Sequence, residues 1–401
     1  MTGRRAKDAG RAPLAVILFT VFVDLIGFGI VVPLLAFYAG AFGGSPVVLG
    51  LLVASFFLMQ FLFAPVLGKL SDRFGRRPVI LVSLGLAVIA YMTLAFAASI
   101  LVLFAARILS GIASANLAVA QAYIADRLPP EERAKGMGLI GAAFGVGLTA
   151  GPVISGTLVP YGLAAPAIAA TGIALANLAM ATAFLPESLN GTRRRVATGR
   201  SLRERVLGPE IVGLLATFFV INLTYSAVPV AYPLLGTRIL GLSARDLAIV
   251  FVYTGLITIV VGGAVGKLAK KAGEEKLVAV GTGLMALAFV ATPFMITVLG
   301  FYALAGILAV GLSLALPLVP ALVSKRIPAD EQGAMLGAAQ ATGSLARIPG
   351  PVLAGWTFGA LGPSAPFLIA GSLMLLGLGL SARIYARRAS FGPEVAAEAS
   401  G

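Results

Sequence analysis

Residues 68–81 read GKLSDRFGRRPVIL, and this charged stretch lies between two long runs without a charged residue, 47–67 and 78–106. A helix of roughly 20 apolar residues crosses the ~30 Å hydrocarbon core of a bilayer, so each run is long enough to span it. The charged stretch must then lie at a water interface, where Gly68 and Gly75 permit tight backbone. It therefore predicts the turn between two membrane helices.

The composition indicates a multi-span membrane protein. The chain has 401 residues, 59% hydrophobic and 11% charged, with a mean hydropathy of +0.99, whereas soluble domains carry about 25% charged residues. The net charge of +14 lies in short loops, not on a basic face, so we expect no nucleic-acid partner. Without Cys or His, carboxylates are the titrating groups left for membrane chemistry. We find no nucleophile elbow or phosphate-binding loop, so we expect no enzyme activity, no metal and no cofactor.

Hydropathy predicts an all-α integral membrane protein with twelve transmembrane helices. The predicted spans are 13–39, 47–69, 78–98, 100–124, 134–159, 163–184, 210–236, 246–268, 277–298, 300–323, 333–358 and 364–386. Of the 30 Lys and Arg residues, all but Arg107, Arg238, Arg245 and Arg347 lie in the termini or the even-numbered loops. By the positive-inside rule, both termini are then cytoplasmic, as an even number of spans permits. We expect a multi-pass protein of the cell inner membrane.

The two halves of the chain are related by an internal repeat. Residues 122–156 align without gaps on residues 321–355, an offset of 199 (321 − 122), with ten identities in 35 positions. Within one residue, the same offset places GKLSDRFGRRP over GKLAKKAGEEK of 266–276. Two pseudo-symmetric six-helix bundles follow, which in transporters alternate access to a midplane site. The predicted parts are a cytoplasmic tail at 1–12, bundles at 13–185 and 210–386, an Arg-rich cytoplasmic linker at 186–209, and a second tail at 387–401.

Four stretches carry motif patterns. The turn holds Gly68, Asp72, Arg73, Gly75, Arg76 and Arg77; span 1 holds DLIGFGIVVPLL from Asp24; span 4 holds Arg107 to Gly111; and span 5 holds Gly138, Gly147, Gly151, Pro152 and Gly156. With these motifs the whole chain resembles the major facilitator superfamily, and in particular its drug:proton antiporters of the tetracycline-efflux type. Two small departures are Ser110, where Gln is more usual, and Ser155, which replaces a glycine.

The resemblance implies a gating network in the charged turn. Asp72, Arg76 and Asp126 would form an ion network at the inner end of the first bundle, with Asp72 facing the start of span 11. A carboxylate at a helix N-terminus gains about 0.3 to 2 kcal/mol, which is enough to bias a gate. The alternative for the turn is orientation by positive charge alone. For the span 5 glycines, the alternative to an antiport function is simple helix packing.

Asp24 and Arg107 are the candidate proton-coupling pair. Asp24 is about 11 residues into span 1, or ~16 Å at 1.5 Å per residue, which is the bilayer centre. A charge there costs at least ~2.5 kcal/mol, so it usually faces a cavity and serves function. Burial favours the neutral acid, and a nearby guanidinium favours the anion. We expect Asp24 to carry the coupling proton and Arg107 to set when it leaves.

Polar and aromatic residues within the spans are candidates for substrate binding. They are Phe56, Gln60, Asn116, Gln121, Asn222, Tyr225, Tyr253, Gln340 and Arg347. The alternative is that such residues only bond neighbouring helices. A mainly apolar cavity with scattered amides and rings suits small amphiphilic compounds. We expect a monomer in the lipid bilayer that exports such compounds, driven by the proton gradient.

Two other functions fit parts of the sequence. A transporter of the same fold could carry a defined anionic metabolite or lipid, with Arg347 as the anion clamp. A non-transporting scaffold or receptor is disfavoured by the charges near the bilayer centre.

Overall fold

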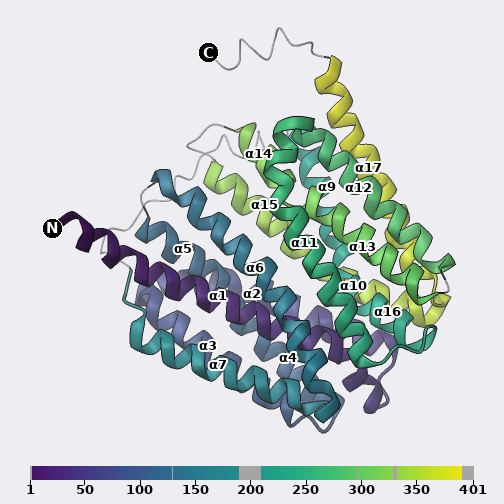
Figure 1. Ribbon diagram of the computed structural model, residues 1–401, viewed down its shortest axis with the longest axis horizontal. Helices are drawn as coiled ribbons and strands as arrows, with labels where there is room; N and C mark the ends of the chain where they lie inside the picture. Colours follow the sequence, from purple (N-terminus) through teal and green to yellow (C-terminus); the bar gives the residue numbers. More distant parts are fainter. Residues whose placement is uncertain (1, 129, 189–208, 296, 328–331, 391–401) are drawn as a thin grey trace. The chain divides into compact units, whose positions relative to one another are not determined.

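The computed structural model describes residues 2–128, 130–188, 209–295, 297–327 and 332–390, and their regular secondary structure is entirely helical (Figure 1). Ten segments of this described part are long and apolar enough to cross a membrane. The two other predicted spans, 134–159 and 333–358, correspond to α6 and to α15 with α16. The chain is therefore an all-helical, multi-pass membrane protein.

Two compact units make up the chain. The first comprises Met1–Arg195 with Tyr232–Gly255, and the second comprises Val196–Ala231 with Leu256–Gly401. Most of the predicted linker, at 189–208, lies outside the described residues, so the bundle boundaries at 13–185 and 210–386 stay a prediction.

Long apolar helices form the first unit. They are α1 (Thr2–Ala41), α2 (Pro46–Phe74), α3 (Arg76–Ala95), α4 (Ile100–Ser114), α5 (Leu117–Arg127), α6 (Pro130–Leu158), the short η1 (Val159–Tyr161) and α7 (Ala164–Phe184). Serine side chains cap two of them: Ser45 Oγ accepts from Val48 N at the start of α2, and Ser99 Oγ accepts from Val102 N at the start of α4. These caps satisfy amide groups that the first helical turn leaves without partners.

The second half of the chain contains α9 (Pro209–Ser226), α10 (Val228–Arg238), α11 (Ala244–Ala272), α12 (Glu274–Ala291), η2 (Thr292–Phe294), α13 (Val298–Ala315), α14 (Leu318–Lys325), α15 (Gln332–Ala346), α16 (Pro349–Leu361) and α17 (Ala365–Ser390). Most of α10 and the first part of α11 belong to the first unit, because that unit includes Tyr232–Gly255.

Several predicted spans consist of two helices. The breaks fall between α4 and α5, α9 and α10, α13 and α14, and α15 and α16. Proline lies at or just after the last three breaks, at Pro229, Pro317 and Pro349, where it cannot donate a helical hydrogen bond. The break at Arg347 and Ile348 has no counterpart in the repeat, because α6 is continuous.

The charged turn is shorter than its sequence suggested. Helix α2 continues through Phe74 and α3 begins at Arg76, so Gly68 lies within a helix and Gly75 alone separates the two. Gly75 has φ 103°, and Gly273, its counterpart between α11 and α12, has φ 85°. Glycine adopts such angles readily, whereas other residues are strained there. The repeat therefore preserves this turn geometry in both halves.

Candidate functional site

Arg76 lies at the centre of an ion network at one end of the first unit. Its Nη1 is 2.6 Å from Asp72 Oδ1, and its Nε donates to Asp126 Oδ2 at 3.0 Å. Nη1 also donates to the buried Ser71 Oγ at 2.6 Å. The Arg76 side chain is only 10% exposed, so the three acceptors replace the water that it lost on folding. The structure thus brings together Asp72, Arg76 and Asp126.

Glu187 joins this network as a cap on α3, a role that the sequence analysis missed. Its carboxylate accepts from the backbone N of Arg76 at 2.8 Å and of Arg77 at 3.1 Å. The Glu187 carbonyl accepts from Arg127 Nη2 at 2.6 Å, and Arg77 Nη2 donates to Thr182 O at 2.7 Å. These bonds hold the segment after α7 in contact with the start of α3. The sequence signal was the acid in LPES at 185–188, directly after an apolar span.

Two other residues of the turn play smaller parts. Gly75 lies against Glu187, since a Cβ built there would collide with the Glu187 carboxylate. Arg73 is exposed, with its guanidinium carbon 5.2 Å from the centre of the Phe74 ring. Among the described residues, no atom lies within 4 Å of a Cβ built at Gly68, so their packing does not explain that glycine. The predicted approach of Asp72 to the start of span 11, at 333, would join the two units and stays a prediction.

Asp24 is hydrogen-bonded within the first unit by an amide. Asn116 Nδ2 donates to Asp24 Oδ2 at 2.8 Å, and Asn116 is buried in the break between α4 and α5. Because the break frees Asn116 from a continuous helix, its side chain can reach α1. An amide donor also stabilises a carboxylate without adding a second charge. Asn116, proposed above as a substrate ligand, thus contacts the proposed proton carrier.

Arg107 is 2% exposed and packs against aromatic rings. Its guanidinium carbon is 4.5 Å from the centre of the Phe56 ring and 6.0 Å from that of Phe28. Its Nε donates to Leu52 O at 3.4 Å. Asp24 and Arg107, both described, form no ion pair with each other in this structure. Cation–π contacts therefore stabilise the buried guanidinium in place of a carboxylate.

Tyr91 lies near both members of this pair. A Cβ built at Gly27, one turn after Asp24, would overlap the Tyr91 hydroxyl and lie 2.9 Å from Cε2 of its ring. The Tyr91 hydroxyl interacts electrostatically with both Asp24 and Arg107. Sequence reasoning did not single out Tyr91, because a neutral tyrosine in an apolar span carries no charge to mark it. The glycine that admits its ring was the only available signal.

Glycines of α6 let it pack directly on α1, the helix that carries Asp24. A Cβ at Gly147 would lie 2.8 Å from Phe22 O, and one at Gly151 would lie 2.5 Å from Ile26 O and 2.6 Å from Gly29 Cα. Such backbone-to-backbone packing requires small residues. Pro152 is buried one residue later. A Cβ at Gly156 would lie 2.9 Å from Ala248 Cβ in the same unit, whereas the side-chain surroundings of position 138 are not described.

The remaining substrate candidates of the first unit differ in exposure. Gln60 is half-buried, and its Nε2 donates to Ser114 O at 3.4 Å. Gln121 is half-buried, and Tyr253 is 37% exposed. Phe56 is buried beside Arg107, as described above. The bond from Gln60 joins α2 to the end of α4, so this residue at least partly serves helix packing.

In the second unit, Asn222 of α9 lies beside Gly343 of α15, one helical turn before Arg347. A Cβ at Gly343 would lie 3.3 Å from Asn222 Nδ2, and Gly343 O accepts from the Arg347 backbone N at 3.2 Å. Asn222 is buried, and its Nδ2 donates to Phe218 O at 2.9 Å. Tyr225 is half-buried one turn further along α9, whereas Gln340 on α15 is exposed. Three of the predicted substrate residues thus belong to one region of α9, α15 and the break that follows α15.

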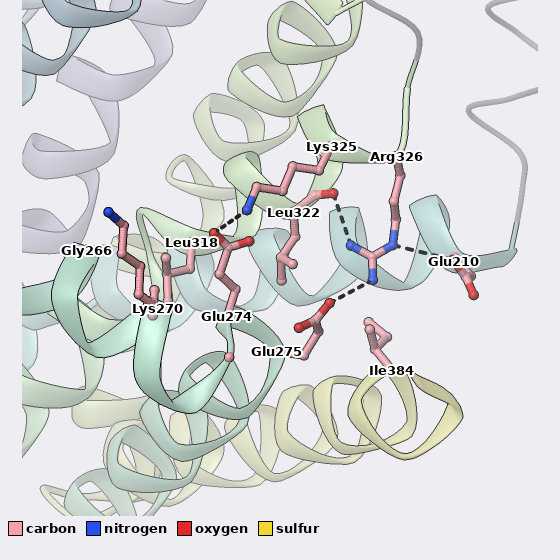
Figure 2. Close-up of a pocket in the computed structure, with 12 residues that line it drawn as sticks. Glu210, Gly266, Lys270, Glu274, Glu275, Leu318, Leu322, Lys325, Arg326 and Ile384 are labelled. Carbon is pink, nitrogen blue, oxygen red and sulfur yellow. Dashed lines mark hydrogen bonds and ion pairs between the residues drawn. The ribbon is translucent and has the colours of Figure 1, made fainter. Parts of the chain in front are cut away.

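The second unit also contains a charged pocket of about 770 Å³ near the starts of α9 and α12. Figure 2 shows the Arg326 guanidinium between two acids, with Nε 3.4 Å from Glu210 and Nη2 3.3 Å from Glu275. Lys325 Nζ is 2.7 Å from Glu274 Oε1. The pocket is lined by as many acidic as basic side chains, which are largely paired with each other. It therefore offers no surplus charge to a ligand.

One of these pairs is a charge-inverted copy of a pair in the first unit. Arg76 aligns with Glu274 at an offset of 198, and Asp126 aligns with Lys325 at an offset of 199. Both pairs are made, at 3.0 Å and 2.7 Å respectively, with opposite signs at each position. The repeat therefore preserves the ion pair while exchanging its charges.

Sequence comparison decides the family. The family profile described as Major Facilitator Superfamily matches residues 17–351. The chain belongs to the major facilitator superfamily. Members of this superfamily are transporters, so the chain is a membrane transporter and not an enzyme.

Individual relatives in the superfamily cover most of the chain. The tetracycline resistance protein, class C, of Escherichia coli is 37% identical over 349 residues, covering 85% of this chain and 88% of that protein. Multidrug resistance protein 2 of Bacillus subtilis (strain 168) is 27% identical, covering 91% and 93%. A solved structure of a bacterial homologue of the human lysosomal transporter Spinster is similar in fold, with a TM-score of 0.78 over 93% of this chain and 96% of that one, at 14% identity. The major facilitator fold predicted from the four motifs is therefore confirmed.

Proposed function

We propose that the chain is a proton-coupled antiporter that exports small amphiphilic organic compounds, including drug-like and tetracycline-like molecules. Two bundles of six helices, twelve spans in all, would expose a central site alternately to either side of the cell inner membrane. Both termini are cytoplasmic in this proposal, the working unit is a monomer, and the proton gradient is the only energy source. The names of the tetracycline and multidrug resistance relatives support the direction and the substrate class.

The bond between Asp24 and Asn116 is the observation that carries the proposal. The Asn116 amide gives the Asp24 carboxyl group, which lies in an otherwise apolar span, a neutral hydrogen-bond donor. The carboxyl group can therefore exist with or without its proton. Arg107 is buried nearby without a carboxylate partner among the described residues, and a change in its distance to Asp24 would alter the balance. Binding of a charged substrate, or the change between outward- and inward-facing states, can thereby favour release of the proton from Asp24.

The ion network around Arg76 serves as the gate in this proposal. The Oδ1 atom of Asp72 is paired with Arg76, but the Asp72 side chain is 65% exposed. Its carboxylate can therefore also interact with other groups that approach it. Replacing Asp72 by Asn removes the charge and keeps the size. We expect transport to fall while expression stays near normal. Unchanged distance distributions between labels on the inner ends of spans 2 and 11 would contradict this gating role.

Inverted membrane vesicles test the coupling. A pH gradient is imposed, candidate amphiphiles are added, and proton release is followed with a pH-sensitive dye. Asp24→Asn should abolish substrate-dependent proton release and uphill transport, while Asp246→Asn, which removes a carboxylate bonded to Ser243 at the start of α11, should retain both. Uphill transport with wild-type proton release in the Asp24→Asn variant would exclude Asp24 as the coupling site.

The alternative is a proton-coupled transporter of the same fold that carries a defined anionic metabolite or lipid. The isolated charge of Arg347 is the observation in its favour. Saturable uptake of an anionic metabolite, with no proton movement for any amphiphile, would support this alternative.

A further inference from the structure

Arg347 is a single basic residue in the break between α15 and α16. It lies about 14 residues into the predicted span 333–358, which places it near the bilayer centre. Its counterpart in the repeat is Leu148, within the continuous helix α6. Neither the charge nor the break is therefore required by the duplicated architecture. A charge at this depth usually marks a functional site.

The Arg347 charge is not neutralised by the described part of the second unit. Its Nε is buried without a hydrogen-bond partner, and its side chain forms no ion pair with a described residue. The described carboxylates of this unit, on Glu210, Glu274 and Glu275, are paired with Lys325 or Arg326. A guanidinium nitrogen that is buried without a partner is costly, so the retention of Arg347 points to an anion that binds and leaves during the transport cycle.

The surroundings of Arg347 add to the attraction for an anion. Helix α16 has 13 residues and begins at Pro349, so the positive end of its dipole lies beside Arg347. Broken membrane helices in transporters direct such ends toward anionic groups of substrates. Because Pro349 has no N–H, the helix end contributes mainly its dipole, and the guanidinium supplies the donors.

Close packing fixes the position of this break. A Cβ built at Gly350 would collide with Leu223 O and with the Ser226 hydroxyl, so the start of α16 lies directly against α9. One turn before Arg347, Gly343 lies against Phe218 and Asn222 of the same helix. The guanidinium therefore extends from a rigid support, which reduces the ordering cost of binding.

We propose that Arg347 binds an organic anion, so that the amphiphiles exported under the function proposed above carry a negatively charged group such as a carboxylate or sulfonate. The guanidinium binds this group through charge-assisted hydrogen bonds. The apolar walls of the spans accommodate the remainder of the molecule. The inference that these anions are exported rests on the proposed function, whereas their binding to Arg347 does not require proton coupling.

A matched pair of fluorescent probes tests the inference at equilibrium, without a pH gradient. Anilinonaphthalene sulfonate and N-phenylnaphthylamine share the same rings and differ in the sulfonate. Purified protein in bilayer discs of phosphatidylcholine is titrated with each probe. We expect wild-type protein to bind the sulfonate at least about tenfold more tightly than the neutral probe. Arg347→Gln should weaken sulfonate binding by about tenfold to a hundredfold and change binding of the neutral probe by less than about twofold.

Two further variants separate the site from general effects of charge. Arg383→Gln removes an exposed positive charge from α17 of the same unit and should bind both probes like wild type. Arg347→Lys keeps the charge and should retain part of the preference for the sulfonate. Because Arg347 is unpaired without ligand, the Gln variant should unfold at the same temperature as wild type or higher. The sulfonate should raise the unfolding temperature of wild type only.

The lipid composition distinguishes a soluble anion from a lipid headgroup. If phosphatidylglycerol in the discs weakens sulfonate binding to wild type but not to Arg347→Gln, the same site takes an anionic headgroup. If the lipid has no effect, the site is specific to the soluble anion. Equal binding of both probes by wild type and Arg347→Gln would overturn the inference, and so would a lower unfolding temperature of the Gln variant without probe. Loss of proton coupling with retained sulfonate binding would refute only the proposed antiport.

Discussion

Substitution of Gly151 by Ala tests whether close packing of α6 on α1 maintains the site around Asp24. The added Cβ would lie 2.5 Å from Ile26 O and 2.6 Å from Gly29 Cα, whereas ordinary contacts begin near 3.4 Å. The helices would therefore have to separate locally by about 0.9 Å (3.4 − 2.5). Both obstructing atoms belong to backbone, so a side-chain rotation cannot relieve the overlap. Such overpacking typically costs about 1 to 3 kcal/mol.

A matched control removes the effect of helix propensity. Gly85 lies within α3, and no atom of the described part of the chain lies within 4 Å of a Cβ built there. Ala is favoured over Gly within a helix by about 0.5 to 1 kcal/mol, and both substitutions receive this gain. The difference in unfolding free energy between Gly151→Ala and Gly85→Ala should therefore equal the overpacking cost, about 1 to 3 kcal/mol.

The assay is reversible denaturant unfolding in mixed micelles, paired with transport in vesicles. We expect Gly85→Ala to be as stable as wild type or more stable, with normal transport. Gly151→Ala should be less stable and should transport more slowly, because Ile26 and Gly29 belong to the helix that carries Asp24. Equal stability and transport in the two variants would show that α6 tolerates a methyl group at this position, and the packing argument would fail.

Three other changes follow from the structure. Tyr91→Phe removes the hydroxyl near Asp24 and should shift the pH dependence of transport, whereas Tyr38→Phe, whose hydroxyl donates to Leu163 O at 2.8 Å, should leave the pH profile unchanged; identical profiles would argue against a role for Tyr91 in coupling. Glu187→Gln should lower the unfolding free energy by about 1 kcal/mol by weakening the cap on α3, as measured by denaturant unfolding, and wild-type stability would contradict that cap. Glu274→Lys and Lys325→Glu should each reduce transport, and the double exchange should restore it, in a double-mutant cycle; additive losses would contradict the pair.

Much of the fold could be predicted because hydrocarbon and water impose opposite demands. The charges in 68–81 cannot lie in a bilayer, so they located the ends of α2 and α3 to within a few residues. The exact turn could not be predicted, because a helix can extend beyond the membrane into water without an energetic penalty. The break at Arg347 was hidden for a similar reason, since hydropathy measures the length of an apolar segment and not its continuity.

The candidate site divides in the same way. Asp24, Arg107 and Arg347 were identifiable because each is an ionisable residue in an apolar span. The partners of these residues were not, because Asn116 and Tyr91 are neutral and their contacts join different helices. A sequence pattern within one segment gives no information on how far that segment lies from another. Only the fold shows which amide reaches Asp24.

The inverted ion pair shows why counting Lys and Arg residues predicts an orientation for the second half but not the pairing of its charges. Orientation depends on the number of Lys and Arg in a loop, and Lys270, Lys271 and Lys276 supply it around the two glutamates of the second turn. Pairing depends on opposite signs at two contacting positions, and Coulomb energy is unchanged when the signs are exchanged. Glu274 and Lys325 can therefore replace the Arg and Asp of their repeat counterparts without loss of the bond, while the neighbouring lysines retain the positive charge on which the predicted orientation depends. Because Lys325 is 66% exposed in its side chain, the pair contributes at most about 1 kcal/mol, so stability alone does not explain its retention through the duplication.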